Sequence, residues 1–335
     1  MEAEREAIRD IEICIDTKQR ELKCEQLIEK AKEENKSFLR AKATTMLLGE
    51  YFEQKRYRDA LALADTLIPF LKRIEHKQLI IEASLIHAKV FHAVQDLPKA
   101  KGALILSQAA ASDIYVKPEL QSKLDHTGGI LCCDGNDYQV AFSYFFESFF
   151  NLIKIDTDRA QEELMNLLIC KVMASQHSEI PLLLGRKELA PFVGPATETI
   201  LDISECVQKH QLHDFRSLLE TRKQYLSGDV VQQALGRLQV IIVERYITRV
   251  LSAYCRIEMS FLAELTGLEL EFIHQTVRTM ILDGKLLGSI EEDSGHVTLQ
   301  HKEVRTDLHV AATEVLSKMK VAVGQLDSKV ADWRT

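Results

Sequence analysis

Proline and glycine are scarce in this chain. Only 6 prolines and 14 glycines occur among its 335 residues. Both residue types interrupt helices and strands, so their scarcity leaves long uninterrupted windows. In those windows apolar residues recur at steps of three and four rather than in alternation. Together with a composition that is 46% hydrophobic and 27% charged, this predicts a folded and mostly helical protein.

Long apolar runs are also absent. No stretch approaches the roughly 20 apolar residues that a membrane span requires, and charged residues occur at Glu2, Glu4, Arg5 and Glu6 instead of an apolar leader. The seven cysteines are odd in number and form no C-x-x-C pair, which disfavours both a disulfide framework and a zinc site. We therefore expect a cytoplasmic and nuclear protein with no membrane partner.

Catalytic signatures are missing as well. The sequence contains no H-E-x-x-H, G-x-x-x-x-G-K-[ST], G-x-G-x-x-G or G-x-S-x-G motif. The two histidines His210 and His213 have helical spacing, but no cysteine or acidic residue completes a metal-ligand set around them. We expect no enzymatic activity, no cofactor and no metal.

An internal repeat is the most informative positive feature. The motifs Tyr57-x-x-Ala60, Leu97-x-x-Ala100 and Tyr138-x-x-Ala141 recur about 40 residues apart. In each case the motif opens the second helix of a predicted pair, with a small residue where two helices would cross. The pattern is similar to tetratricopeptide repeats and predicts a degenerate helical solenoid over residues 37–176, after an N-terminal helical segment at 1–36.

The predicted helices follow this repeat up to a segment that interrupts their periodicity. Proline and glycine cluster between 176 and 195, where we place a domain junction. Beyond it a second unit covers 195–303. The predicted helices before and after the junction span 37–54, 56–73, 77–95, 98–116, 118–133, 137–153, 196–210, 213–226 and 230–253.

The last part of the second unit reads as a winged helix at 256–303. A short helix reaches Leu265, the turn Thr266-Gly267 follows, and a second helix covers about 269–283. Two strand-like runs at 286–290 and 296–300 are separated by an acidic turn. A long helix at 304–335 closes the chain, with apolar residues at steps of three and four on one side.

This order of elements resembles the PCI-domain family, whose members occur in the proteasome lid, the COP9 signalosome and translation initiation factor three. Within it the similarity is to a scaffold subunit of the proteasome lid. The similarity extends from about residue 10 to the end and is carried by segments 55–61, 91–100, 141–145, 212–215 and 280–285. Members of this type usually begin with about ninety further solenoid residues.

The resemblance implies a mostly α fold with a TPR-like helical solenoid, a PCI domain made of a helical bundle plus winged helix, and a long C-terminal helix. It implies a non-catalytic scaffold that supports lid assembly and ATP- and ubiquitin-dependent protein degradation. The implied partners are other lid PCI subunits and the lid helical bundle, with the proteasomal ATPase ring and the outer ring of the core particle. A scaffold subunit of the COP9 signalosome is an alternative that shares this architecture.

Two features are expected to form subunit interfaces. Exposed strand edges pair readily with other chains, and an apolar helix face without an evident partner in the chain calls for one elsewhere. The expected contact residues are Leu286, Leu287, Ile290, Val297 and Leu299 in the wing, and Leu308, Val315, Met319, Leu326, Val330 and Trp333 in the last helix.

A winged helix also suggests a nucleic-acid-binding regulator, which charge disfavours. Residues 256–303 carry four basic and nine acidic residues. The predicted recognition helix has Glu269 and Glu271 near its start and Arg278 as its one strong base. Its charge would therefore match neither the phosphates nor the base edges of a nucleic acid. We expect no nucleic-acid partner.

Overall fold

The computed structural model describes residues 17–34, 36–226, 228–291, 295–299 and 307–332. Contacts divide the chain into two compact units, Met1–Gln239 and Val240–Thr335. The division falls inside one long helix, α13 (Asp229–Leu251), and not in the proline- and glycine-rich segment at 176–195. Among the described helices, none combines the length and the apolar character that crossing a membrane would need.

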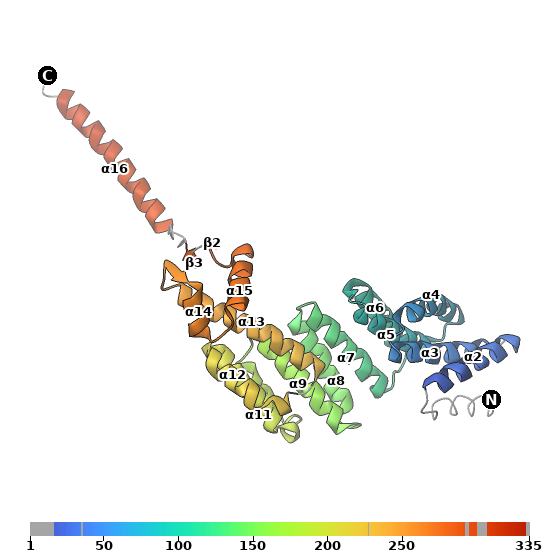
Figure 1. Cartoon of the computed structure of the whole chain (residues 1–335). Coiled ribbons are helices and arrows are strands. Elements are labelled where there is room, and N and C mark those ends of the chain that lie inside the picture. Colours follow the sequence, from blue (N-terminus) through green and yellow to red (C-terminus); the bar gives the residue numbers. More distant parts are fainter. Residues whose placement is uncertain (1–16, 35, 227, 292–294, 300–306, 333–335) are drawn as a thin grey trace. The chain divides into compact units, whose positions relative to one another are not determined.

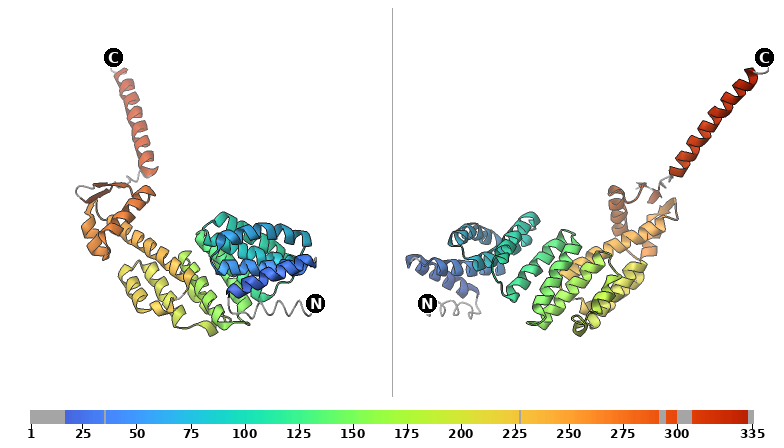
Figure 2. Two further views of the ribbon diagram at one scale, coloured as in Figure 1. Left: turned by 45° about the vertical axis from the view of Figure 1, so that its right-hand side comes forward. Right: turned by 180° about the vertical axis from the view of Figure 1, so that it is seen from behind.

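The first unit is a succession of paired helices, as predicted, and Figures 1 and 2 show them stacked in chain order. The predicted boundaries of the three solenoid pairs are met to within a few residues. The helices are α2 (Thr17–Glu33), α3 (Ser37–Glu53), α4 (Tyr57–Ile74), α5 (Lys77–Ala93), α6 (Leu97–Ser112), α7 (Pro118–Asp134), α8 (Tyr138–Leu152), α9 (Thr157–Met173), α10 (Glu179–Leu184), α11 (Pro195–Lys209) and α12 (Leu212–Thr221), with 3₁₀ turns at Ala190–Phe192 and Lys223–Tyr225.

The turn that ends the first helix of each pair has the same backbone in every repeat. One residue adopts a left-handed conformation, and two N–H groups bond back to carbonyls near the helix end, as in a Schellman motif. In the first copy the N–H of Arg56 donates to the carbonyl of Tyr51 at 2.9 Å. The left-handed residues are Lys55, Gln95, Asn136, Ser175 and His210, so two copies follow the three that the sequence repeat predicts.

The residue five positions after each of these turns is fully buried. Small residues fill the position in the first three copies, where helices cross closely, and large apolar residues fill it in the last two. All five are 0% exposed: Ala60, Ala100, Ala141, Ile180 and Phe215. The segment predicted as a junction therefore lies inside the repeated array, since the turn at Ser175 and the buried Ile180 belong to it.

Helices α7 and α8 approach so closely that only glycine fits between them at one point. A Cβ atom on Gly129 would lie 2.5 to 2.8 Å from three ring carbons of Phe145. Carbon atoms in van der Waals contact are about 3.5–4.0 Å apart. Phe145 is itself 0% exposed, so its ring sits in the middle of the packed core.

Helix α9 was not predicted from the sequence. Asp156 caps it by accepting hydrogen bonds from the N–H groups of Asp158 and Arg159, and every residue from Glu163 to Val172 is buried. Exposed residues are confined to its first turns, at Thr157, Asp158, Arg159, Gln161 and Glu162. The rest of the helix therefore lies in the core with no open face.

The second unit contains the winged helix that the sequence predicts. After α13 come β1 (Arg256–Glu258), α14 (Met259–Thr266), α15 (Leu270–Leu282), β2 (Gly288–Glu291), β3 (His296–Leu299) and α16 (Asp307–Asp332). The three strands form one antiparallel sheet in the order β1-β3-β2. Strand β1 was not predicted, and it makes β3 the central strand of the sheet.

Candidate interaction surfaces

The described residues offer no metal-binding cluster, since no group of three or more His, Cys, Asp or Glu side chains converges in this part of the chain. Of the histidine pair noted in the sequence, His210 adopts a left-handed conformation at the end of α11 and His213 is exposed on α12. The candidate sites described below are surfaces that could contact other proteins.

The wing sheet has two open edges. Because β3 pairs with both neighbours, β1 and β2 are the edge strands, and each has one side free of strand partners within the described sheet. The pairing of β2 with β3 needs a glycine at its first position, where a Cβ atom on Gly288 would lie 2.6 Å from the carbonyl oxygen of Thr298. An unpaired strand edge is a template for a strand from another chain.

The predicted wing residues divide into two groups. Val297 is 0% exposed and Leu286 is 8% exposed, so both side chains pack inside the winged helix and are not available at its surface. This corrects their assignment as contact residues: both side chains belong to the core of this small domain, together with buried residues of α14 and α15. Leu287 is exposed, and Ile290 and Leu299 are half-buried.

Several exposed apolar residues of the second unit were not anticipated from the sequence. Leu282 at the end of α15 is 77% exposed and lies near Leu287 in the chain. Between them Lys285 forms an ion pair of 2.8 Å with Glu244 of α13, which holds the turn. Leu270 and Phe261 are also exposed. Periodicity alone cannot separate such residues from core leucines, because it does not say which face a neighbour covers.

The last helix presents a wide apolar face. Every side chain described between Ala311 and Gly324 is exposed. With about 100° between successive residues, the apolar positions cover an arc of about 120° centred on Met319. The predicted stripe included Val315 and Met319; Leu316 and Val323 widen it and were missed.

Other residues predicted for this helix lie beyond its described side chains. Leu308, Leu326 and Val330 fall within the bounds of α16, at positions whose helical spacing places them on the same face as Met319. Trp333 lies outside the described residues. The apolar face therefore rests on the described residues of the helix and on the regular spacing of the sequence beyond them.

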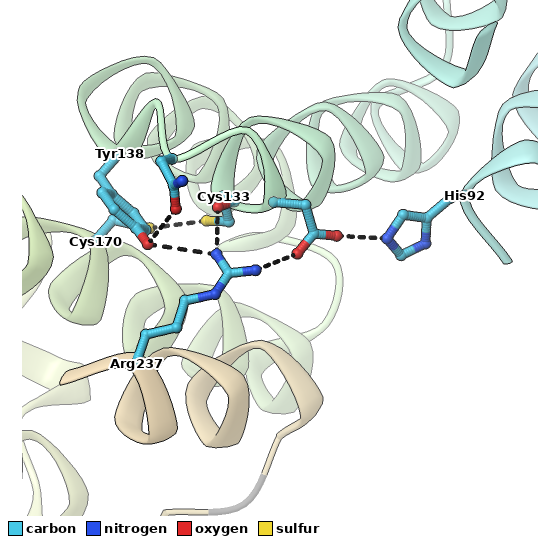
Figure 3. Close-up of polar contacts among 7 residues, drawn as sticks. His92, Cys133, Tyr138, Cys170 and Arg237 are labelled. Atoms are coloured by element: carbon cyan, nitrogen blue, oxygen red, sulfur yellow. Dashed lines mark hydrogen bonds and ion pairs between the residues drawn. The ribbon is translucent and has the colours of Figure 1, made fainter. Parts of the chain in front are cut away.

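A polar network inside the first unit attaches α13 to the solenoid (Figure 3). Arg237 donates to the carbonyl oxygen of Cys133 at 2.7 Å and to the carboxylate of Asp134 at 3.0 Å. The other oxygen of Asp134 lies 2.6 Å from Nε2 of His92, and the hydroxyl of Tyr138 lies 3.4 Å from the guanidinium. The carbonyl of Cys133 also accepts the backbone N–H of Asn136 at 3.1 Å, so Arg237 adds a charged donor to a carbonyl at the end of α7. The network joins α5, α7, α8 and α13.

Two further buried polar groups lie in the same part of the solenoid. Asp125 is 2% exposed, and burial raises the pKa of its carboxyl to about 6, although Gln121 and Asn151 donate hydrogen bonds to it. Sγ of Cys133 lies 3.4 Å from Sγ of Cys170, and this hydrogen bond together with burial raises the pKa of the Cys170 thiol. The Cys170 thiol is therefore protonated and unreactive at neutral pH.

Comparison with known proteins assigns the helical array and wing to a family. Residues 204–301 match the PCI domain. The chain is 30% identical over 304 residues to the 26S proteasome non-ATPase regulatory subunit 11 homolog of Arabidopsis thaliana. The aligned region covers 90% of this chain and 73% of the relative. It is 32% identical over 295 residues to the probable 26S proteasome regulatory subunit rpn6 of Schizosaccharomyces pombe, covering 88% and 70%. It is 30% identical over 304 residues to the 26S proteasome non-ATPase regulatory subunit 11 of Dictyostelium discoideum, covering 90% and 74%.

Proposed function

The chain belongs to the family of 26S proteasome non-ATPase regulatory subunit 11, and from this premise we propose that it is a scaffold subunit of the proteasome lid without catalytic activity of its own. The observation that carries the proposal is the extent of the similarity, which covers about nine tenths of the chain and includes both solenoid and PCI domain. In this role the chain supports ATP- and ubiquitin-dependent protein degradation by holding other subunits in place, in the cytoplasm and the nucleus.

The C-terminal helix is the part of the chain that we assign to the lid helical bundle. Its apolar face is exposed over the described side chains, with Val315, Leu316 and Met319 all more than half exposed. Burying one such side chain contributes about 1.5–3 kcal/mol. An apolar face of this width matches the packing of a helix among several partner helices rather than against one.

The edges of the wing sheet are assigned to neighbouring PCI subunits. Strand β2 has an open side and is flanked by the exposed Leu287, and β1 offers a second open side on the other edge. Main-chain pairing at an edge would supply affinity, and the adjacent apolar side chains would select the partner. By family resemblance we place further contacts of the solenoid on the ATPase ring and the outer ring of the core particle.

The helix assignment can be tested with two substitutions that each place an aspartate on α16, on opposite sides of the helix. Met319 and Val321 are 61% and 62% exposed on α16, but Val321 lies on the opposite side of the helix from the apolar face. Met319→Asp places a carboxylate at the centre of the proposed contact, where desolvation penalises it. We expect incorporation into the lid, measured by quantitative mass spectrometry after purification through another lid subunit, to fall at least about tenfold.

Val321→Asp introduces the same charge and a similar loss of apolar surface, so it should leave incorporation within about twofold of the unchanged chain. If both variants were incorporated as well as the unchanged chain, the proposed bundle contact would be contradicted. An equal loss in both would also contradict it, since the effect would then not depend on the face of the helix.

A further inference from the structure

A groove crosses the first helices of successive solenoid repeats. Three adjoining cavities of about 410, 200 and 300 Å³ lie along it, bordered by residues of α3, α5, α7 and α9. All three are lined by Lys123 of α7, and the two smaller ones also by Lys89 of α5. The shared lining shows that the cavities form one continuous surface feature centred on these two lysines.

The groove has acidic residues at its walls, and those near its centre already have partners. Glu82 lies 3.0 Å from the ammonium of Lys42, and Glu163 lies 2.5 Å from Nδ1 of His126. Glu119 and Glu162 are exposed to solvent. Glu82 is thus paired with a cation of the protein, and Glu163 contacts the imidazole of His126.

The two central lysines have no such partner. Within the described residues the ammonium group of neither Lys89 nor Lys123 forms a hydrogen bond or an ion pair. Burial together with the nearby charge of Lys123 lowers the pKa of Lys89. Two ammonium groups that line the same cavity and repel each other form a site where an anion is stabilised. Apolar side chains border the same groove at Met46, Leu85 and Ile86.

We propose that this groove binds an extended, acidic peptide segment, whose carboxylates contact Lys89 and Lys123 and whose apolar side chains rest on α3 and α5. Neighbouring helices are about 8–10 Å apart, so four of them span about 25–30 Å. An extended chain rises about 3.3 Å per residue, which gives a segment of about eight residues. The acidic groups on the walls disfavour a nucleic acid, whose phosphates repeat at every nucleotide, and suit a peptide with spaced carboxylates.

This inference goes beyond the role in lid assembly, because the isolated chain should bind the peptide. The probe is a fluorescein-labelled peptide of about ten residues with alternating Glu and Leu, and binding is followed by fluorescence anisotropy. The control peptide has Gln in place of Glu. We expect saturable binding of the acidic probe and at least about tenfold weaker binding of the control.

Charge substitutions locate the site. Lys89→Gln with Lys123→Gln should weaken binding at least about tenfold. Lys154→Gln with Lys187→Gln removes the same charge from exposed lysines of the same unit that do not line these cavities, and it should change binding by less than about twofold. Thermal unfolding by circular dichroism checks that each variant is folded.

Amine acetylation read by mass spectrometry gives a second measurement that needs no variant. The bound peptide should protect Lys89 and Lys123 and leave Lys154 unprotected. The proposal is overturned if the probe shows no saturable binding up to about 1 mM, if the control variant loses as much affinity as the groove variant, or if a single-stranded oligonucleotide binds the same site more tightly than the peptide.

Discussion

The close approach of α7 and α8 makes Gly129 sensitive to the addition of a single methyl group. Replacing it with alanine adds one methyl group, and that group would meet three ring carbons of Phe145 at 2.5 to 2.8 Å. The ring has no room to withdraw, because Phe145 is 0% exposed. To reach an ordinary carbon–carbon contact the methyl group and the ring must move apart by about 1 Å, and neighbouring core contacts must loosen with them.

The magnitude follows from two opposing effects. Overpacking of a core by one methyl group costs about 1–3 kcal/mol. Alanine in place of glycine inside a helix gains about 0.5–1 kcal/mol. We therefore expect Gly129→Ala to lower the free energy of unfolding of the first unit by about 0.5–2 kcal/mol. Gly102, inside α6, provides the matched control, because a Cβ atom there meets nothing within 4 Å.

Urea unfolding followed by circular dichroism measures both variants. Gly102→Ala should stabilise the chain by about 0.5–1 kcal/mol, so the two alanine variants should differ in opposite directions from the unchanged chain. Shortening the ring with Phe145→Leu should cost less in the Gly129→Ala background than alone, because the methyl group fills part of the space. If Gly129→Ala is as stable as Gly102→Ala, the packing argument is wrong.

Two other substitutions test the buried polar groups. The carboxyl of Asp125 has a pKa of about 6 in the folded chain against an ordinary value of 3.8, so its ionisation lowers stability as the pH rises through this range. Asp125→Asn should raise the free energy of unfolding by about 1–3 kcal/mol at pH 7.5 and by little at pH 4, and equal effects at both pH values in urea titrations would contradict this. Arg237→Met removes the hydrogen bonds to Cys133 and Asp134 and should cost about 1–3 kcal/mol. The exposed Arg245, replaced in the same way on the same helix, should cost less than about 0.5 kcal/mol in parallel melts.

Local pattern was sufficient for most of the helices. The solenoid pairs recur about 40 residues apart with small residues at the crossing positions Ala60, Ala100 and Ala141, so the repeat marks them in the sequence. It was insufficient for α9, which lies outside the three recognised copies of the repeat, and for β1, whose three residues become a strand by pairing with β3. The predicted junction at 176–195 was based on prolines and glycines. The repeated turn at Ser175 comes directly before this segment, and the buried Ile180 of the same repeat lies inside it.

The interaction surfaces were less predictable than the fold. Alternation in the wing hairpin placed Val297 and Leu287 in one apolar group, and only the packing of the domain shows that the first is buried and the second exposed. The Arg237 network joins residues about one hundred positions apart, which no local signal reveals. The apolar face of α16 was visible because a long helix repeats its spacing over many turns.

Purification from cells decides whether this chain is a scaffold subunit of the proteasome lid. The chain is tagged at its N-terminus so that α16 stays free, recovered gently, and assayed for co-purifying proteins and for ATP-dependent peptidase activity. We expect lid subunits, proteasomal ATPases and core-particle activity to be recovered together. Recovery of the chain alone, or with nucleic acid and without peptidase activity, would contradict the scaffold role.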